Sequence, residues 1–168
     1  IGRNNTQIAS AGGAGTTVAV LDTGVDYTRS AFGGCNAPGG ACKVVYAQDF
    51  AATDNVLDDH GHGTNVAGVV LGVAPQAKIA ALDVFRSDGY AYSSDVINAI
   101  NWCVTNKATY NIAAINMSLG GAGACSGAEQ ATITAAKARG ATIVVATGND
   151  GAPTIGSPAN CSGVVAVT

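Results

Sequence analysis

Five short apolar runs restrict the fold of this sequence more than any other feature. They are rich in Val, Ile and Ala, and they lie at residues 18–21, 79–85, 112–115, 143–146 and 164–167. Short runs of this composition are typical of strands that are buried on both faces. Strands of that type belong to parallel sheets, because the crossovers between parallel strands cover the sheet. We therefore expect all five runs to be buried strands of one parallel sheet.

Two helical patterns lie between these runs. Ser94 is placed to cap a helix whose apolar residues, from 96 to 104, recur at helical spacing. Ser126 and Glu129 have the spacing of a capping box, and Gly140 is placed to end the same helix. The alternation predicts an α/β fold, with a parallel sheet flanked by helices on both faces.

The composition argues against two classes of partner. Charged residues make up 11% of the chain, against about 25% in an average protein. The net charge is −3, which does not suit a protein that neutralises phosphates, so we expect no nucleic acid partner. The apolar fraction is 48%, but no unbroken run approaches the roughly 18 residues of a membrane span. We therefore expect no membrane partner.

The first residues and the five cysteines suggest a secreted protein. Residues 1–4 contain neither an initiator Met nor an apolar signal, so we expect a targeting segment to have been removed. Cysteines in a chain with few charges favour an oxidising, extracellular compartment. Cys35 and Cys42 enclose a turn-rich loop and are expected to form a local disulfide. Cys103 lies in an apolar run and is expected to be a buried free thiol.

Polar segments follow three of the predicted strands. They begin at Asp22, Asn116 and Thr147. In open parallel sheets, ligands bind outside the carboxyl ends of the strands, where these segments would meet. Each segment taken alone is as typical of an ordinary turn or loop as of a functional site.

A fourth segment, residues 58–68, contains both histidines of the chain. His60 and His62 titrate near neutrality and stand beside glycines that permit close approach, which favours a functional role. A hydrolase with these histidines and an aspartate as metal ligands is one alternative. A dinucleotide-binding enzyme is another, but the glycines at 12–15 precede their strand, whereas the fingerprint must follow one.

Together these segments resemble, in chain order, the successive signatures of the subtilisin-like serine proteases. The segments are VAVLDTG at 18–24, GHGTNVAG at 61–68, NMSLGG at 116–121 and GNDG at 148–151. The resemblance covers essentially the whole chain, and four motifs in order are far more specific than one. It implies a subtilisin-like fold and a secreted serine endopeptidase that hydrolyses peptide bonds through an Asp-His-Ser triad.

The resemblance also implies roles for individual residues. Asp22 would orient an imidazole, and His62 would be the general base, since it stands directly before Gly-Thr as in the family. Asn149 matches the amide that donates to the developing oxyanion.

Two backbone segments resemble those that hold an extended peptide substrate by strand addition. Their residues are Gly89, Tyr90, Ala91, Ser118, Leu119 and Gly120. Gly156 resembles the floor of the primary side-chain pocket. Cys125 and Cys161 lie just beyond the walls of that pocket, which implies a second disulfide.

The family's nucleophilic serine motif is absent from residues 1–168, and the last apolar run has nothing after it to cover it. None of the candidate serines within the chain lies in a segment that resembles this motif. They are Ser118, Ser126, Ser157 and Ser162. We therefore expect residues 1–168 to be the N-terminal part of one catalytic domain. A C-terminal part would carry the serine, and an N-terminal propeptide would be a further partner. The alternative is a catalytically inactive fragment or a pseudoprotease that binds peptides.

No cofactor is expected for catalysis, and a strong calcium site is not expected. The path across residues 68–75 is short and lacks the inserted loop that builds a calcium site in several relatives. Asp54, Asp58 and Asp59 could supply oxygen ligands, but a solvated acidic loop is the favoured interpretation.

Overall fold

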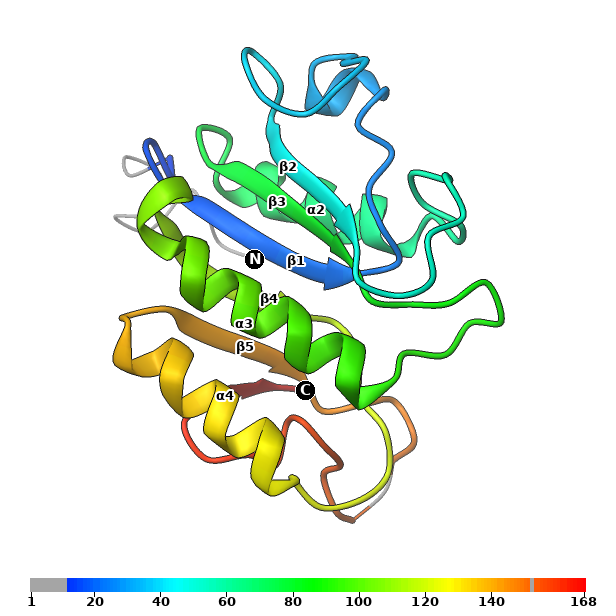
Figure 1. Cartoon of the computed structure of the whole chain (residues 1–168), viewed down its shortest axis with the longest axis vertical. Helices are drawn as coiled ribbons and strands as arrows, with labels where there is room; N and C mark the ends of the chain where they lie inside the picture. The colour runs from blue at the N-terminus through cyan, green and yellow to red at the C-terminus, as the bar shows by residue number, and fades with distance from the viewer. Residues whose placement is uncertain (1–11, 152) are drawn as a thin grey trace.

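One parallel sheet forms the centre of the protein (Figure 1). The computed structural model describes residues 12–151 and 153–168, and within them six strands are hydrogen-bonded in the order β2-β3-β1-β4-β5-β6. The strands are β1 (Thr17–Asp22), β2 (Val44–Asp49), β3 (Lys78–Asp83), β4 (Ile112–Met117), β5 (Thr142–Ala146) and β6 (Val165–Val167). Every neighbouring pair is parallel, which confirms the predicted sheet.

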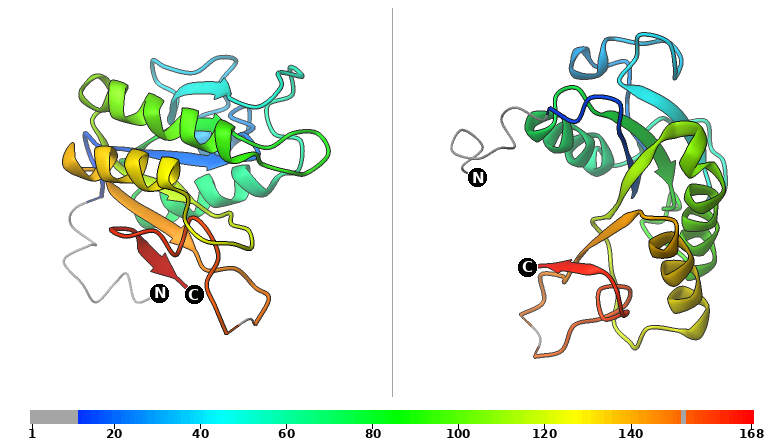
Figure 2. Two further views of the ribbon diagram at one scale, coloured as in Figure 1. Left: turned by 60° about the horizontal axis from the view of Figure 1, so that its bottom comes forward. Right: turned by 90° about the vertical axis from the view of Figure 1, so that its left-hand side faces the viewer.

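Helices lie on both faces of this sheet. They are α2 (His62–Val73), α3 (Ser93–Tyr110) and α4 (Gly127–Ala138), with a short 3-10 helix η2 (Ser30–Phe32). Helices α3 and α4 run side by side on one face, and α2 lies on the opposite face (Figures 1 and 2). The predicted α/β class, with helices on both faces, is therefore confirmed.

Two apolar cores, one on each side of the sheet, fix the direction of the side chains on β1. Leu21 packs into the core beneath α3 and α4, whereas its neighbour Val20 packs into the core that contains Ala67 and Leu71 of α2. Because successive side chains of a strand alternate between faces, Asp22 projects to the same face as Val20. The end of β1 therefore delivers a carboxylate to the α2 side.

All five predicted strands are present, but their exposure and number differ from expectation. The last run, predicted to be buried, forms the edge strand β6, whose Val165 and Val167 are 51% and 50% exposed. In the described part of the chain β6 packs against β5, and no helix packs extensively over its side chains. Strand β2 was not predicted, because Gln48 and Asp49 break its apolar pattern.

The predicted helix ends are correct at α4 and shifted at α3. Ser126 and Glu129 form the predicted capping box. Helix α3 begins at Ser93, and its N-cap makes no side-chain hydrogen bond; the Ser94 hydroxyl donates to Asp95 instead. No helix in residues 12–151 or 153–168 is long and apolar enough to cross a membrane.

The cysteines pair as the sequence predicts. Disulfides join Cys35 to Cys42 and Cys125 to Cys161. Cys103 is a buried free thiol, and burial raises its pKa to about 12. A thiol with so high a pKa is not a reactive nucleophile.

Candidate active site

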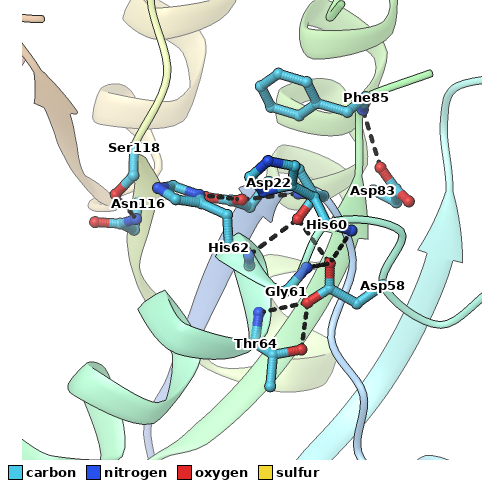
Figure 3. Close-up of polar contacts among 12 residues, drawn as sticks. Asp22, Asp58, His60, Gly61, His62, Thr64, Asp83, Phe85, Asn116 and Ser118 are labelled. Atoms are coloured by element: carbon cyan, nitrogen blue, oxygen red, sulfur yellow. Dashed lines mark hydrogen bonds and ion pairs between the residues drawn. The ribbon is translucent and has the colours of Figure 1, made fainter. Parts of the chain in front are cut away.

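The carboxylate of Asp22 contacts the imidazole of His62 (Figure 3). Asp22 ends β1 and is 1% exposed, whereas His62 begins α2 with 46% of its side chain exposed. Their Oδ1 and Nδ1 atoms are 2.6 Å apart, although the residues are 40 positions apart in the sequence. The contact arises because Asp22 projects to the α2 face, where that helix begins.

Glycines allow the two segments to meet this closely. A Cβ added at Gly63 would lie 2.1 Å from the carbonyl oxygen of Gly24 and 3.1 Å from the Cβ of Asp22. Gly61, which precedes the helix, has a φ of +83° that L side chains rarely adopt. The helix start can therefore rest directly on the end of β1.

The arrangement suits the imidazole for proton transfer. Beside a buried carboxylate, Nδ1 is assigned as the donor, which leaves a lone pair on Nε2. The side chain of His62 is 46% exposed, so this nitrogen belongs to a ring that a reactant can approach. The Asp22 Oδ1 also accepts from the Thr23 amide at 2.8 Å. Its Oδ2 is buried and has no hydrogen-bond partner among the described residues.

His60 does not share this contact. Its ring centre lies 6.5 Å from that of His62, and the residue is exposed. The hydrogen bond found for it runs from its backbone amide to Asp58, at 3.2 Å. Asp22 is therefore paired with His62 alone of the two histidines.

A cavity of about 370 Å³ opens beside His62. Its lining includes Gly89 from one predicted peptide-binding segment and Ser118 from the other. Tyr90 and Ala91 do not line it: Tyr90 is 71% exposed, and Ala91 forms an antiparallel bridge with Phe85. Leu119 packs against the core instead.

A larger cavity of about 770 Å³ lies at the ends of β4, β5 and β6. Gly120 and Gly156 both line it. A Cβ at Gly156 would lie 1.9 Å from the carbonyl oxygen of Gly121, so only glycine fits that wall. The Cys125–Cys161 disulfide joins the two chain segments that carry these walls.

Asn149 lies on the exposed loop that follows β5. Strand β5 neighbours β4, which neighbours β1, so this loop is at the same edge of the sheet as Asp22. Within the described residues its side chain makes no hydrogen bond with Asp22 or His62. The oxyanion role of Asn149 stays a prediction.

The acidic loop differs from its prediction at Asp58. Its carboxylate is not solvated like that of a free loop residue, because it accepts hydrogen bonds from Thr23, Gly61 and Thr64. The sequence signal for this role is an acid four residues before the imidazole.

A second acidic group lies near the site. Asp83 ends β3 beside Asp22 in register and accepts a hydrogen bond from the Phe85 amide. Burial, together with the charges of Asp49, Asp59 and Asp54, raises the pKa of Asp83 to about 7. In the part of the chain that the structure describes, no three His, Cys, Asp or Glu side chains are grouped to hold a metal ion. Calcium binding stays untested.

Known proteins resemble this chain in sequence and in structure. Residues 13–168 match the model of the Subtilase family. A subtilisin-like protease of Coccidioides posadasii is 38% identical over 93% of this chain, and Subtilisin-like protease 3 of Arthroderma benhamiae is 36% identical over 84%. These matches cover 38% and 34% of the two relatives, so the chain spans little more than a third of their length.

Two solved structures share the fold. The S41 Psychrophilic Protease superposes with a TM-score of 0.72 and 33% identity, covering 91% of this chain and 52% of its own. Sphericase superposes with a TM-score of 0.72 and 29% identity, covering 92% and 53%. The likeness therefore extends over nearly all of this chain and about half of each solved structure.

Proposed function

Because this chain belongs to the subtilase family, we propose that it is part of the catalytic domain of a secreted serine endopeptidase. Asp22 and His62 are two members of its Asp-His-Ser triad. The observation that carries this proposal is the 2.6 Å contact between a buried carboxylate and a half-exposed imidazole at the carboxyl end of a parallel strand.

The mechanism follows from that geometry. Nε2 of His62 removes the proton of a serine hydroxyl, whose oxygen attacks the carbonyl carbon of the peptide bond. The imidazolium then donates this proton to the leaving amine, and water repeats the sequence to release the acyl group. Asp22 holds the ring through Nδ1 and stabilises its positive charge while the proton resides there.

The serine is supplied by a C-terminal part of the same domain, of which residues 1–168 are the N-terminal part. The length of the relatives supports this proposal, since the chain covers 38% and 34% of them. The sheet supports it too: Val144 on β5 is only half-buried, and Val165 and Val167 on β6 are about half exposed. A further segment over these side chains would bury the apolar area.

The substrate is a polypeptide that binds in extended form between two backbone segments. Their residues are Gly89, Tyr90, Ala91, Ser118, Leu119 and Gly120. The cavity that Gly89 and Ser118 share with His62 supports this placement. A large side chain of the substrate occupies the neighbouring cavity, whose wall includes Gly156. Asn149 donates its amide to the oxyanion of the tetrahedral intermediate.

The protein is secreted and is made with an N-terminal propeptide. Two disulfides support secretion, because such bonds persist in oxidising compartments. Catalysis by this triad requires no cofactor.

The test is hydrolysis of casein by the full-length protein that contains these residues. We expect cleavage that a fluorophosphonate abolishes and that o-phenanthroline, a transition-metal chelator, leaves unchanged. Inhibition by the chelator alone would favour a metal hydrolase. Peptide binding without any cleavage would favour a pseudoprotease and would overturn the proposal.

A further inference from the structure

One carboxylate, that of Asp58, lies between the segments that carry Asp22 and His62 (Figure 3). Asp58 belongs to the loop that precedes α2. Its Oδ1 accepts from the Thr23 hydroxyl at 2.8 Å and from the Gly61 amide at 2.8 Å. Thr23 follows Asp22 in the chain, and Gly61 precedes His62, so one oxygen atom bridges the neighbours of both residues.

The second oxygen of Asp58 binds the first turn of α2. Its Oδ2 accepts from the Thr64 amide at 2.8 Å and also from the Thr64 hydroxyl. That hydroxyl in turn accepts from the Asp26 amide at 2.9 Å. The helix start is thereby tied a second time to the segment that follows β1.

These bonds close a ring that passes through the catalytic pair. The Thr23 amide donates to Asp22 Oδ1 at 2.8 Å, and the Thr23 hydroxyl accepts from the Gly63 amide at 3.0 Å. Asp22 Oδ1 contacts His62 Nδ1 at 2.6 Å. A displacement of the Asp58 carboxylate would therefore move the carboxylate and the imidazole relative to each other.

The charge of Asp58 also suits its position. The N-cap of α2 is Gly61, which has no side chain to accept from the free amides of the first turn. An anion at this end of a helix is stabilised by those amides and by the helix dipole. Burial raises the pKa of Asp58, but hydrogen bonds from Thr64 and Thr23 outweigh it and hold the pKa below the ordinary value of 3.8. The group is ionised at neutral pH.

We propose that Asp58 is a positioning residue, whose carboxylate sets the separation and orientation of Asp22 and His62. It acts through Thr23 and Thr64 and touches neither substrate nor the reacting atoms. The proposal rests on the proposed function for its kinetic consequence, but its structural part concerns only the ring of hydrogen bonds.

The kinetic test uses Asp58→Asn in the full-length protein, with active sites counted by fluorophosphonate labelling. An amide of the same size offers one acceptor oxygen and turns an NH₂ group toward the donors of Thr64. We expect kcat per labelled site to fall at least tenfold with KM within twofold. Unchanged kcat per labelled site would overturn the proposal, because a variant that is merely less stable loses sites and not turnover per site.

The matched control is Asp54→Asn, which removes a carboxylate from the same loop. Asp54 accepts a hydrogen bond from the Val56 amide and interacts with the side chain of Asp59. Among the described residues it makes none of the hydrogen bonds that join Asp58 to Thr23, Gly61 and Thr64. We expect its kcat to stay within twofold of the wild type. An equal loss in both variants would mean that the charge of the loop matters rather than the position of Asp58, and would overturn the proposal.

A second pair of variants covers the case in which Asp58→Asn does not fold. Thr23→Val removes the hydroxyl that joins Asp58 to Gly63, whereas Thr23→Ser retains it. We expect a tenfold loss of kcat in the first variant and activity within threefold of wild type in the second. Equal activity of the two variants would contradict the proposed ring.

A spectroscopic readout separates this inference from the proposed function. The proton between Asp22 and His62 is expected to give a downfield NMR resonance, whether or not a serine is present. Loss of this resonance in Asp58→Asn but not in Asp54→Asn supports the positioning role even in a protein that cleaves no peptide. The same resonance in both variants overturns it, whereas failure of the wild type to cleave casein overturns only the proposed function.

Discussion

The backbone of Gly63 lies directly against that of Gly24. A Cβ added at Gly63 would come within 2.1 Å of the Gly24 carbonyl oxygen and within 3.1 Å of the Asp22 Cβ. The absence of a side chain at this one position therefore lets the start of α2 reach the end of β1. The contact between Asp22 and His62 depends on that approach.

Gly63→Ala is expected to lower kcat at least tenfold, because the added methyl group must push α2 away from the end of β1. The control is Gly68→Ala in the same helix, where a Cβ would meet nothing within 4 Å. That change should leave kcat unchanged and raise stability by up to about 1 kcal/mol. Steady-state kinetics and thermal melts of both variants provide the check, and an unaffected kcat in Gly63→Ala would contradict the steric argument.

Asp22→Asn is expected to lower kcat by a factor on the order of 10⁴, because an amide no longer holds the required ring tautomer or stabilises the imidazolium. Asp26→Asn serves as the control, since the partners of the Asp26 carboxylate among the described residues are Thr28 and Arg29, at the surface. Turnover should be measured for both with one peptide substrate. If Asp22→Asn keeps wild-type turnover, Asp22 has no part in the mechanism.

The contribution of Asp83 to stability is expected to fall as the pH rises from about 4 to about 7. Burial raises the pKa of Asp83 from 3.8 to about 7, so the folded protein holds a proton that the unfolded chain has lost across this window. The folded state is thus favoured below the lower value, and that advantage disappears as the pH passes the higher one. The effect is on the order of a few kcal/mol.

Asp83→Asn tests this pH dependence, since the amide oxygen can still accept from the Phe85 amide. Urea midpoints measured between pH 4 and pH 8 should decline less in this variant than in the wild type. Parallel curves for the two proteins would show that Asp83 is not the group responsible.

The two disulfides are expected to stabilise the fold unequally. Cys125–Cys161 closes a sequence separation of 36 residues, and Cys35–Cys42 closes one of 7. Loop entropy alone makes the longer bridge worth about 1.5 kcal/mol more. Paired Cys→Ser variants of each bridge, compared by denaturant unfolding, measure this difference. A greater loss from removing the shorter bridge would contradict the entropic account.

The features predicted correctly from the sequence are those that depend on local patterns of residues. The apolar run at 18–21, which lies within β1, and the capping box at Ser126 both follow from short-range periodicity and spacing. Strand β2 was missed because Gln48 and Asp49 interrupt its apolar residues, and its place at the sheet edge tolerates them. An edge position requires little burial, so the apolar signal of such a strand is weak.

In the site, too, the features set by a local motif could be predicted, whereas those set by tertiary packing could not. The motif selected His62 over His60, and in the structure Asp22 contacts only the former. The contacts of Asp58 could not be predicted, because its bond to Thr23 joins residues 35 positions apart and forms only after α2 has docked on the sheet. Contacts of that kind depend on tertiary packing rather than on spacing within a motif.

The central claim is that this chain supplies the aspartate and histidine that activate a serine outside residues 1–168. The most direct measurement is the rate at which a fluorophosphonate labels the full-length protein, with the modified residue mapped by mass spectrometry, in wild type and His62→Ala. We predict one labelled serine, C-terminal to Thr168, and labelling slowed by orders of magnitude in the variant. A label on a serine within this chain, or equal rates in the two proteins, would contradict the account.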